Sequence, residues 1–310
     1  MQNRSVAVCS RSFSRNKILR TELLLKYENV KFNDKGISLE GSELIKFLSG
    51  YDKAIIALEK IDNSILSKLP DLKVISKYGV GLNNIDMNSL RKYKIRIGWK
   101  GGVNKRSVSE LVLGFSINML RQLNICNDFV KSGNFNQHIG RQLTGKTFGI
   151  IGCGNIGKDL VKLLQPFDAK LLVNDIINFD SFFKKYNVEY VKLSKLLTDS
   201  DIISLHVPLD NSTKNLLNKK NLSLLKKDAI LINTARGGLI DENFLKDLLI
   251  KKKISGAAFD VYSIEPPKDY ELLKLSNFFG TPHIGGSSIE AILAMGRSAI
   301  DGLDDNKFVS

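Results

Sequence analysis

The sequence predicts an α/β protein with two doubly wound parallel sheets, each covered by helices. Three observations favour this fold class. Short apolar runs typical of buried strands alternate with helical periodicity along almost the whole chain, which is the pattern of parallel sheets with covering helices. The chain of 310 residues is too long for one core and fits two domains. No low-complexity linker separates its two halves.

The first half of the chain supplies one of these sheets. Its strand-like runs are rich in Val, Ile and Leu, as expected for strands that are buried on both faces. Segments with helical periodicity lie between the runs. The expected strands span residues 5–10, 53–58, 72–78 and 95–99, and the expected helices span 14–27, 62–68 and 86–93.

The second half repeats this plan and supplies the second sheet. A long helical pattern over residues 107–131 is expected to connect the two halves. The last helical pattern, residues 287–306, either caps the second domain or crosses back to the first. The expected strands of this half span residues 147–152, 170–175, 201–207, 229–235, 254–262 and 277–282, and a further helix spans 242–253.

The composition is that of a soluble globular protein, with 43% hydrophobic and 25% charged residues. A net charge of +14 raises the question of a nucleic-acid partner. The lysines are dispersed, however, and their densest run, residues 251–253, lies where a helix should end and where cations suit the helix dipole. We therefore expect a lysine-rich surface rather than a nucleic-acid site. Such a surface favours an anionic substrate only weakly.

The cysteines bear on the cellular location. Cys9, Cys126 and Cys153 are scattered and odd in number, so they form no disulfide framework, and no C-x-x-C pair indicates zinc. No apolar run approaches the ~20 residues that span a bilayer, and the N-terminus lacks the apolar stretch of a signal peptide. We expect a cytoplasmic protein without a membrane segment or a metal site.

Residues 147–160, TFGIIGCGNIGKDL, place three glycines at G-x-G-x-x-G spacing between a strand and a helix. Gly152 permits a tight turn, Gly154 lets the backbone approach a pyrophosphate, and Gly157 lets the helix pack close to the strand. The N–H groups of the helix N-terminus then face the phosphates. Glycine-rich turns also occur for purely structural reasons, so the neighbouring residues must decide.

An acidic residue ends the next strand. Asp175 follows Gly157 at close to the spacing of the ribose-binding acid in Rossmann domains. A carboxylate there accepts hydrogen bonds from the ribose hydroxyls and repels a 2′-phosphate, and residues 176–178 contain no Arg or Lys that could hold one. The alternative is an ordinary strand-end or helix-cap acid. The sequence therefore predicts a Rossmann domain that binds NAD rather than NADP.

A second glycine turn lies in the first half. Residues 77–86, KYGVGLNNID, follow a strand and contain Gly79 and Gly81. Two glycines at the carboxyl end of a strand can expose successive N–H groups to an anion such as a carboxylate. A simple turn that is capped by Asn84 or Asp86 explains the pattern equally well.

Candidates for proton transfer are few, because the chain has only three histidines. His283 and His206 each follow a strand, whereas His138 lies in a polar loop. Arg236 directly follows a buried strand, and Glu265 follows another. The carboxyl ends of strands are where open α/β sheets bind ligands.

An Arg, a Glu and a His at three strand ends form a chemically sensible set. Arg236 can hold a carboxylate through two parallel hydrogen bonds and polarise an adjacent carbonyl. His283 can pass a proton at neutral pH, and Glu265 can orient its ring and stabilise the cationic form. With a nicotinamide cofactor, this set describes hydride transfer to or from C2 of a 2-hydroxy or 2-keto acid. Taken singly, each residue also has an ordinary structural explanation.

The order of these motifs resembles that of the D-isomer-specific 2-hydroxyacid dehydrogenase family. The segments LTGKTFGIIGCGNIG, SLHVPL, LINTARGGLID, GAAFDVYSIEPP and TPHIGG carry the resemblance, and LKVISKYGVGLNNID and NKRSVSELVLG match earlier family segments. The resemblance covers about residues 50–300 and is strongest to the D-3-phosphoglycerate dehydrogenase-like subgroup. It implies a Rossmann cofactor domain, residues 101–289, inserted into a flavodoxin-like substrate domain, residues 1–100 and 290–310.

The resemblance also implies roles for single residues. Arg236 would bind the substrate, Glu265 would support the acid–base His283, and Gly79, Val80 and Gly81 would hold the substrate carboxylate. Asp260 would bind the nicotinamide amide. The implied cofactor contacts are Tyr78, Gly152, Gly154, Asn155, Ile156, Gly157, Asp175, His206, Val207, Pro208, Thr234, Ala235, Asp260, Gly285 and Gly286.

The substrate stays open between two classes of acid. The phosphoglycerate subgroup usually carries Arg after the strand that matches residues 53–58, whereas residues 57–64 offer only Lys60. One candidate is 3-phosphoglycerate with phosphohydroxypyruvate, and the other is a non-phosphorylated acid, as in a hydroxypyruvate or glyoxylate reductase. A non-catalytic NAD-sensing corepressor is the rival from another class, but the sequence lacks long tails for recruiting partners. The apolar segment 107–131 and the resemblance together predict a homodimer formed through the cofactor domain.

Overall fold

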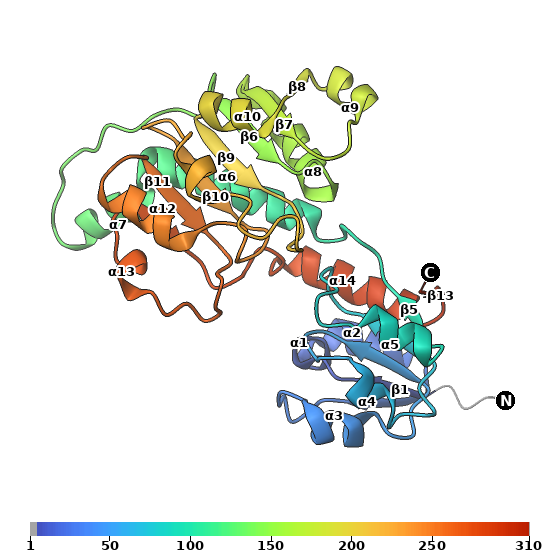
Figure 1. Ribbon diagram of the computed structural model, residues 1–310. Coiled ribbons are helices and arrows are strands. Elements are labelled where there is room, and N and C mark those ends of the chain that lie inside the picture. The colour runs from blue at the N-terminus through green and yellow to red at the C-terminus, as the bar shows by residue number, and fades with distance from the viewer. Residues whose placement is uncertain (1–4, 310) are drawn as a thin grey trace. The chain divides into compact units, whose positions relative to one another are not determined.

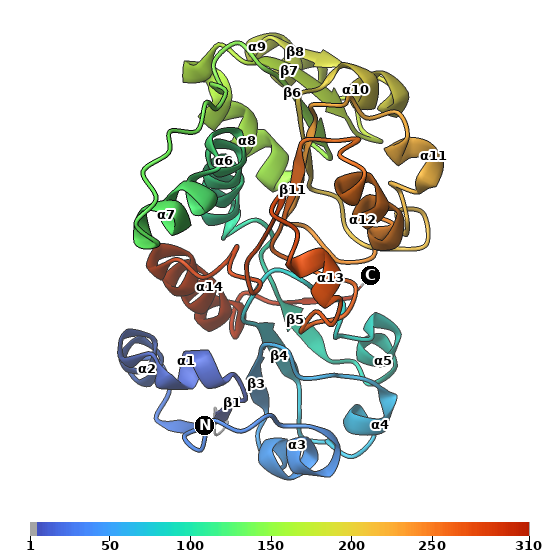
Figure 2. The same ribbon diagram turned by 90° about the vertical axis from the view of Figure 1, so that its left-hand side faces the viewer.

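The computed structural model describes residues 5–309. The chain divides into two compact units, Met1–Asn104 with Ile289–Ser310, and Lys105–Ser288. Each unit contains one sheet with helices on both of its faces (Figures 1 and 2). The predicted fold class, α/β with two parallel sheets, is therefore confirmed.

The first unit is built on a six-stranded sheet in the order β13-β5-β4-β3-β1-β2. Strands β1 to β5 are parallel, and β13 pairs with β5 in the antiparallel direction. The five parallel strands have the order of flavodoxin-like domains, in which the order reverses between β1 and β3. The strands are β1 Ser5–Val8, β2 Asn29–Phe32, β3 Lys53–Ile56, β4 Val74–Lys77, β5 Arg96–Gly98 and β13 Lys307–Phe308.

Two cores lie on opposite faces of this sheet, because successive side chains of a strand point in opposite directions. Val6 and Val8 pack with α1, α2 and α14, whereas Ala7 and Cys9 pack with α3, α4 and α5. Figure 2 shows these two groups of helices on either side of the strands. The helices are α1 Arg11–Arg15, α2 Lys17–Leu24, α3 Gly41–Leu48, α4 Asn63–Leu66, α5 Met87–Lys92 and α14 Ile289–Gly302.

The second unit is built on a seven-stranded sheet in the order β12-β11-β10-β9-β6-β7-β8. All of its strand pairs are parallel. This is the Rossmann order, and it reverses between β6 and β9. The strands are β6 Thr147–Ile151, β7 Lys170–Asn174, β8 Val188–Tyr190, β9 Ile202–Leu205, β10 Ile230–Asn233, β11 Gly256–Phe259 and β12 Phe278–Gly280.

In this sheet, too, successive residues of a strand pack in cores on opposite faces. Ile202 packs in the core that α6 and α8 cover, and Ile203 packs in the core that α10 and α12 cover. Burial on both faces explains why these strands are continuous apolar runs in the sequence. The helices are α6 Lys105–Arg121, α7 Leu123–Lys131, α8 Asn155–Leu164, η1 Gln165–Phe167, α9 Asp180–Lys185, α10 Leu193–Asp199, α11 Lys219–Leu222, α12 Glu242–Ile250 and α13 Tyr270–Leu273.

The prediction of one helix over residues 107–131 is wrong. Gln122 has φ +50°, and a residue in this left-handed conformation cannot continue a right-handed helix. The segment is therefore two helices with different surroundings. The first, α6, buries Val112, Phe115 and Leu120, whereas α7 contains no buried residue.

The last helix follows one of the two paths that its sequence pattern left open. Helix α14 belongs to the first unit, where it contacts α2, β4 and β5. Several elements had too weak a pattern to be predicted, among them the edge strands β2 and β8, whose residues are all half-buried or exposed. No helix within residues 5–309 is long and apolar enough to cross a membrane.

Candidate active site

The glycine turn after β6 is closely packed except at its middle glycine. Gly152 has φ +94°, and a Cβ there would lie 2.7 Å from the carbonyl oxygen of His206. A Cβ on Gly157 would overlap the carbonyl oxygen of Gly152. A Cβ on Gly154 would meet nothing within 4 Å. The turn therefore leaves open space in front of Gly154, where α8 begins.

Asp175 lies directly after β7 and is tied to this turn. Its Oδ2 accepts a hydrogen bond from the N–H of Cys153 at 2.5 Å, and its Oδ1 accepts one from the N–H of Ile177 at 2.9 Å. Burial, with a smaller effect of the Asp175 charge, raises the pKa of the Cys153 thiol to about 12. The carboxylate is thus fixed beside the glycine turn, and the thiol stays protonated at neutral pH.

His283 and Glu265 are in direct contact. His283 Nδ1 lies 2.8 Å from Glu265 Oε2, and Glu265 Oε1 accepts a hydrogen bond from the N–H of Tyr262 at 3.2 Å. The His283 side chain is 51% exposed and that of Glu265 is 40% exposed. The pair is therefore held in place from behind while the imidazole remains open to a ligand.

Asp260 holds the loop that carries His283. Its carboxylate accepts hydrogen bonds from Thr281 Oγ1 at 2.6 Å, Ile284 N–H at 2.7 Å and Gly285 N–H at 2.7 Å. Asp260 is 1% exposed, so these bonds satisfy a charge that burial would otherwise penalise. The acid expected to bind the nicotinamide amide thus has a loop-holding role in the structure.

Arg236 follows β10 on a loop that touches the Glu265 loop. Its Nη1 donates to the carbonyl of Ala235 at 2.6 Å, and its own carbonyl accepts from Asn233 Nδ2 at 2.8 Å. A Cβ on Gly237 would overlap the Tyr262 carbonyl, so the two loops pack against each other. Burial lowers the pKa of Arg236, and the negative charge of Glu265 opposes that shift.

Four buried side-chain atoms of this unit have no hydrogen-bond partner among residues 5–309, and two of them lie at the carboxyl ends of strands. These two are Thr234 Oγ1, at the end of β10, and His206 Nδ1, after β9; the others are Asn118 Nδ2 and Ser200 Oγ. The other ring nitrogen of His206 lies 3.0 Å from Ser204 Oγ. Although His206 as a residue is only partly buried, burial of its ring lowers its pKa to about 3. His206 is therefore neutral at physiological pH and is a poor candidate for the acid–base group.

The remaining expected cofactor residues line the same end of the second sheet or its loops. Asn155 and Ile156 begin α8, and Gly285 is held by Asp260 and, through its carbonyl, by Ser107 Oγ at 2.7 Å. Val207 and Pro208 follow β9, Ala235 follows β10, and Gly286 follows Gly285. The structure therefore brings the predicted residues of the second unit to one edge of the sheet.

Tyr78, Gly79, Val80 and Gly81 lie in the first unit, after β4. The Tyr78 ring packs edge-on against Phe13 in the core, 5.6 Å between ring centroids. Gly79 has φ +118°, which only glycine adopts easily. The structure thus gives Tyr78 a packing role, and its expected cofactor contact stays a prediction.

Sequence reasoning missed two residues that support this turn. Trp99 Nε1 donates to the carbonyl of Val80 at 3.0 Å. Lys77 is 4% exposed, and its ammonium group bonds to Asn84 Oδ1 at 2.8 Å and to the carbonyl of Ala57. The signal for Lys77 was present in the sequence, because a lysine within a buried strand must find acceptors. No local pattern indicated the contact of Trp99.

The chain is similar to known proteins over most of its length. A family model described as "D-isomer specific 2-hydroxyacid dehydrogenase, NAD binding domain" matches residues 113–285, which lie in the second unit. The chain is 34% identical over 287 residues to the hydroxypyruvate reductase of Thermotoga maritima, with 91% of this chain and 92% of that protein covered.

Two further matches differ in the length that is covered and in the substrate that the protein's name gives. The chain is 36% identical over 267 residues to the D-3-phosphoglycerate dehydrogenase of Methanocaldococcus jannaschii, covering 83% of this chain but only 50% of that protein. Among solved structures, D-lactate dehydrogenase from Aquifex aeolicus complexed with NAD and lactic acid matches with a TM-score of 0.84 at 26% identity. That match covers 96% of this chain and 93% of the other.

Proposed function

The chain belongs to the D-isomer-specific 2-hydroxyacid dehydrogenase family, and from that premise we propose that it interconverts a D-2-hydroxy acid and its 2-keto acid with NAD. The observation that carries this proposal is the contact of 2.8 Å between His283 Nδ1 and Glu265 Oε2. The pair lies on loops at the carboxyl edge of the sheet that also bears the glycine turn and Arg236.

The residues of the second unit fit NAD. The open space in front of Gly154 leaves the N–H groups at the start of α8 available to a pyrophosphate. Asp175 follows the second strand of the Rossmann order, the position from which an acid accepts hydrogen bonds from the ribose hydroxyls. Its carboxylate retains lone pairs beyond the two hydrogen bonds that it accepts within the protein. The buried hydroxyl of Thr234 lacks a partner within the described chain, as expected for a group that a bound cofactor would satisfy.

His283 moves the proton in this mechanism. The cofactor, when bound, supplies or receives a hydride at C2 of the substrate. For reduction, His283 begins as imidazolium, donates Nδ1–H to Glu265, and delivers the Nε2 proton to the C2 oxygen of the keto acid. For oxidation, neutral Nε2 accepts the hydroxyl proton. Glu265 stabilises the imidazolium, and the N–H of Tyr262 holds the carboxylate in place.

Arg236 and the turn after β4 are assigned to the substrate. The guanidinium of Arg236 would bind the carboxylate or polarise the C2 carbonyl, because its fork matches two oxygens. Gly79, Val80 and Gly81 would offer backbone N–H groups to the substrate carboxylate. Trp99 supports that turn through the carbonyl of Val80.

A panel of 2-keto acids tests the proposal. The absorbance of NADH should fall when the protein is mixed with NADH and one of phosphohydroxypyruvate, hydroxypyruvate, glyoxylate or pyruvate. The D-hydroxy acid should be the only enantiomer formed. Binding of NADH without turnover of any 2-keto acid would instead favour the non-catalytic NAD-sensing alternative.

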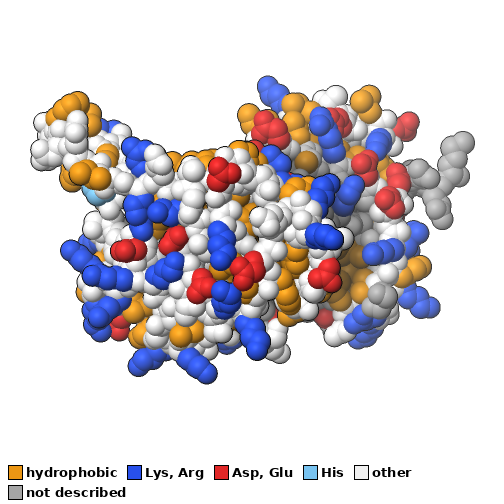
Figure 3. Space-filling model, turned by 90° about the horizontal axis from the view of Figure 1, so that it is seen from above, with side chains coloured by type: hydrophobic (Ala, Val, Ile, Leu, Met, Phe, Trp, Pro, Cys, Tyr) orange, Lys and Arg blue, Asp and Glu red, His pale blue; other side chains and the backbone are white. Residues whose placement is uncertain are grey.

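We also propose a homodimer that forms through the second unit. Helix α7 and the loop after it expose Val130 to 60%, Phe135 to 85% and Ile139 to 94%. Figure 3 shows hydrophobic side chains on the segment that projects at the left, where α7 lies in Figure 1. Apolar exposure of this kind marks a contact surface. Light scattering at micromolar concentration should give twice the chain mass, and replacing Phe135 and Ile139 by Ser should give a monomer.

We also propose a cytoplasmic location. Cys9 and Cys153 are buried free thiols, and Cys126 is also unpaired, as is usual in a reducing compartment. Cell fractionation with an antibody against the chain tests this location, and recovery with secreted proteins would contradict it.

A further inference from the structure

A cavity of about 1290 Å³ lies within the first unit, at the carboxyl ends of its central strands. Its lining includes Ser10 after β1, Ala57 after β3 and Tyr78 after β4. The strand order of the sheet reverses between β1 and β3, and open α/β sheets bind ligands at such a reversal. The cavity is therefore placed where a ligand is expected.

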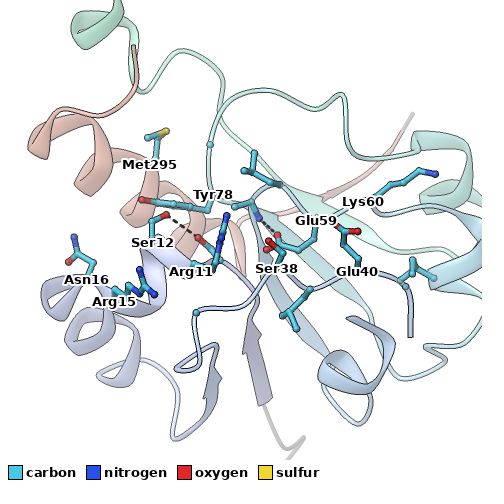
Figure 4. Close-up of a pocket in the computed structure, with 18 of the residues that line it drawn as sticks. Arg11, Ser12, Arg15, Asn16, Ser38, Glu40, Glu59, Lys60, Tyr78 and Met295 are labelled. Carbon is cyan, nitrogen blue, oxygen red and sulfur yellow. Dashed lines mark hydrogen bonds between the residues drawn. The ribbon is translucent and has the colours of Figure 1, made fainter. Parts of the chain in front are cut away.

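Two arginines of α1 line this cavity (Figure 4). Arg11 and Arg15 are four positions apart on one short helix, so their side chains share a face. Neither guanidinium has an ion pair or hydrogen bond to any residue between 5 and 309. In the same unit, Arg20 pairs with Asp34 and Arg297 pairs with Glu22. The two cavity arginines are thus available to a ligand.

The position of Arg15 is set by a glycine. A Cβ on Gly36 would overlap the guanidinium of Arg15, so that group lies against the loop after β2. Gly36 has φ +62°, a conformation that disfavours any other residue. The guanidinium therefore occupies space beside the cavity that a larger residue at position 36 would remove.

Two of the three acidic side chains that line the cavity already have hydrogen-bond or ion-pair partners within the protein. Glu59 Oε2 accepts a hydrogen bond from the N–H of Ala57 at 2.6 Å. Asp62 caps α4 and pairs with Lys60, 2.9 Å between Oδ2 and Nζ. Glu40 is the one acid of the lining without a partner among the described residues. The unpaired charges that face the cavity are therefore two cations and one anion.

We propose that Arg11 and Arg15 form a subsite for a second anionic group on the substrate, a phosphate or a carboxylate at the end remote from C2. The inference rests on the proposed function, because the cavity is also lined by Tyr78 and Gly79, which begin the turn assigned to the substrate carboxylate. The planar fork of a guanidinium matches either anion through two parallel hydrogen bonds.

This subsite bears on the absence of arginine from the residues that follow β3. The residues after β3 offer only Lys60 as a cation, and that side chain is already paired with Asp62. The structure brings two further cations into the same cavity from the end of β1. A doubly anionic keto acid can therefore be recognised without arginines after β3.

Specificity constants measure the proposal directly. The wild type and the variants Arg11→Gln and Arg15→Gln are compared on phosphohydroxypyruvate, 2-oxoglutarate and hydroxypyruvate. Each variant should lower the ratio of kcat/KM for the preferred doubly anionic acid to kcat/KM for hydroxypyruvate by roughly 10- to 100-fold, the usual value of a charge-assisted contact. Loss confined to phosphohydroxypyruvate supports a phosphate subsite, and loss confined to 2-oxoglutarate supports a carboxylate subsite.

A control and a second readout keep the test decisive. Lys17→Gln removes a charge from an exposed residue beside α1 that does not line the cavity, and it should leave the ratio unchanged. Trp99 is the only tryptophan of the chain and contacts Val80, so its emission reports on folding and ligand binding in the first unit. Titration with 3-phosphoglycerate, D-2-hydroxyglutarate and D-glycerate should show tighter binding of one of the two doubly anionic acids than of D-glycerate, and Arg11→Gln should abolish that difference.

The possible failures are separable. Turnover of hydroxypyruvate with equal ratios in the wild type and both variants would overturn the subsite and leave the proposed function intact. If the protein reduces no 2-keto acid, the proposed function fails. The Trp99 titration then still tests whether these arginines bind an anion, and equal affinities for all three ligands would overturn the subsite.

Discussion

The backbone of His283 has φ +56°, which a residue other than glycine adopts only when its surroundings hold it there. Asp260 provides that restraint by accepting hydrogen bonds from Thr281, Ile284 and Gly285, on both sides of His283. The direction of the imidazole thus depends on a buried acid that does not touch the ring. These contacts join residues that are 21 to 25 positions apart, so no local pattern could reveal them.

Glu265 should support proton transfer by His283 through their contact of 2.8 Å. Glu265→Gln keeps a hydrogen-bond acceptor near Nδ1 but removes the negative charge that faces the ring. The kcat of reduction should therefore fall, while the affinity for NADH should stay unchanged. Measuring both constants on the wild type and the variant checks this, and a variant with the wild-type kcat would show that Glu265 only shapes the turn.

Asp175 should set the choice between NADH and NADPH. Asp175→Asn keeps an oxygen for the N–H of Cys153 and removes the charge, whereas Asp175→Ala also removes the bond to the turn. The ratio of the dissociation constants for NADPH and NADH should fall in the Asn variant, because repulsion of the 2′-phosphate is lost. Equal affinity of the wild type for both cofactors would contradict this role.

His206 should make the folded state sensitive to acid. Its pKa is about 3 in the folded protein against 6.5 as the reference value, so only the unfolded chain binds this proton between those values. Above pH 6.5 His206 is neutral in both states, and the free energy of unfolding is unaffected by this group. As pH falls below 6.5 the unfolded chain gains the proton, and the free energy of unfolding drops by about 2 kcal/mol at about pH 5. Denaturant titrations should show a smaller pH dependence for His206→Gln and an unchanged one for His138→Gln, whose side chain is exposed.

At the scale of elements, two glycines of the turn between β6 and α8 should affect different properties, one the binding of NADH and the other the stability of the fold. Gly154→Ala places a methyl group in open space, so the free energy of unfolding should change little while NADH binds at least roughly tenfold more weakly. Gly157→Ala drives its methyl group into the carbonyl of Gly152 and should destabilise the protein by about 1–3 kcal/mol. Urea titration and NADH fluorescence check both variants, and a Gly154→Ala protein with wild-type NADH affinity would contradict this account.

The sequence pattern predicted the strands that are buried on both faces of their sheet. Strands β1, β3, β6 and β9 read as apolar runs because each supplies two cores. The edge strand β2 has a mixed pattern, since none of its residues is fully buried. The break at Gln122 was also invisible, because the residues on both sides of it favour a helix and only the backbone angle ends α6.

At the scale of the whole molecule, the predicted site residues divide between the two units. The second unit contains Arg236, Glu265, His283 and most of the expected cofactor contacts, and the first contains Tyr78 and the turn Gly79–Gly81. Sequence could assign these positions because they lie at the ends of predicted strands and within the motifs that resemble the family. It could not identify Arg11 and Arg15, because the cavity that they line is formed from segments distant in sequence. The roles of all these residues stay predictions.

The measurement that tests the central claim most directly compares the wild type with His283→Ala in NADH-dependent reduction of a 2-keto acid, with NADH affinity measured on both. The wild type should turn over, and the variant should lose roughly 10²–10⁴ in kcat, the usual contribution of a general acid. NADH affinity should be unchanged, because the groups proposed to hold the cofactor are the glycine turn and Asp175. A variant that keeps the wild-type kcat would contradict the claim that His283 transfers the proton.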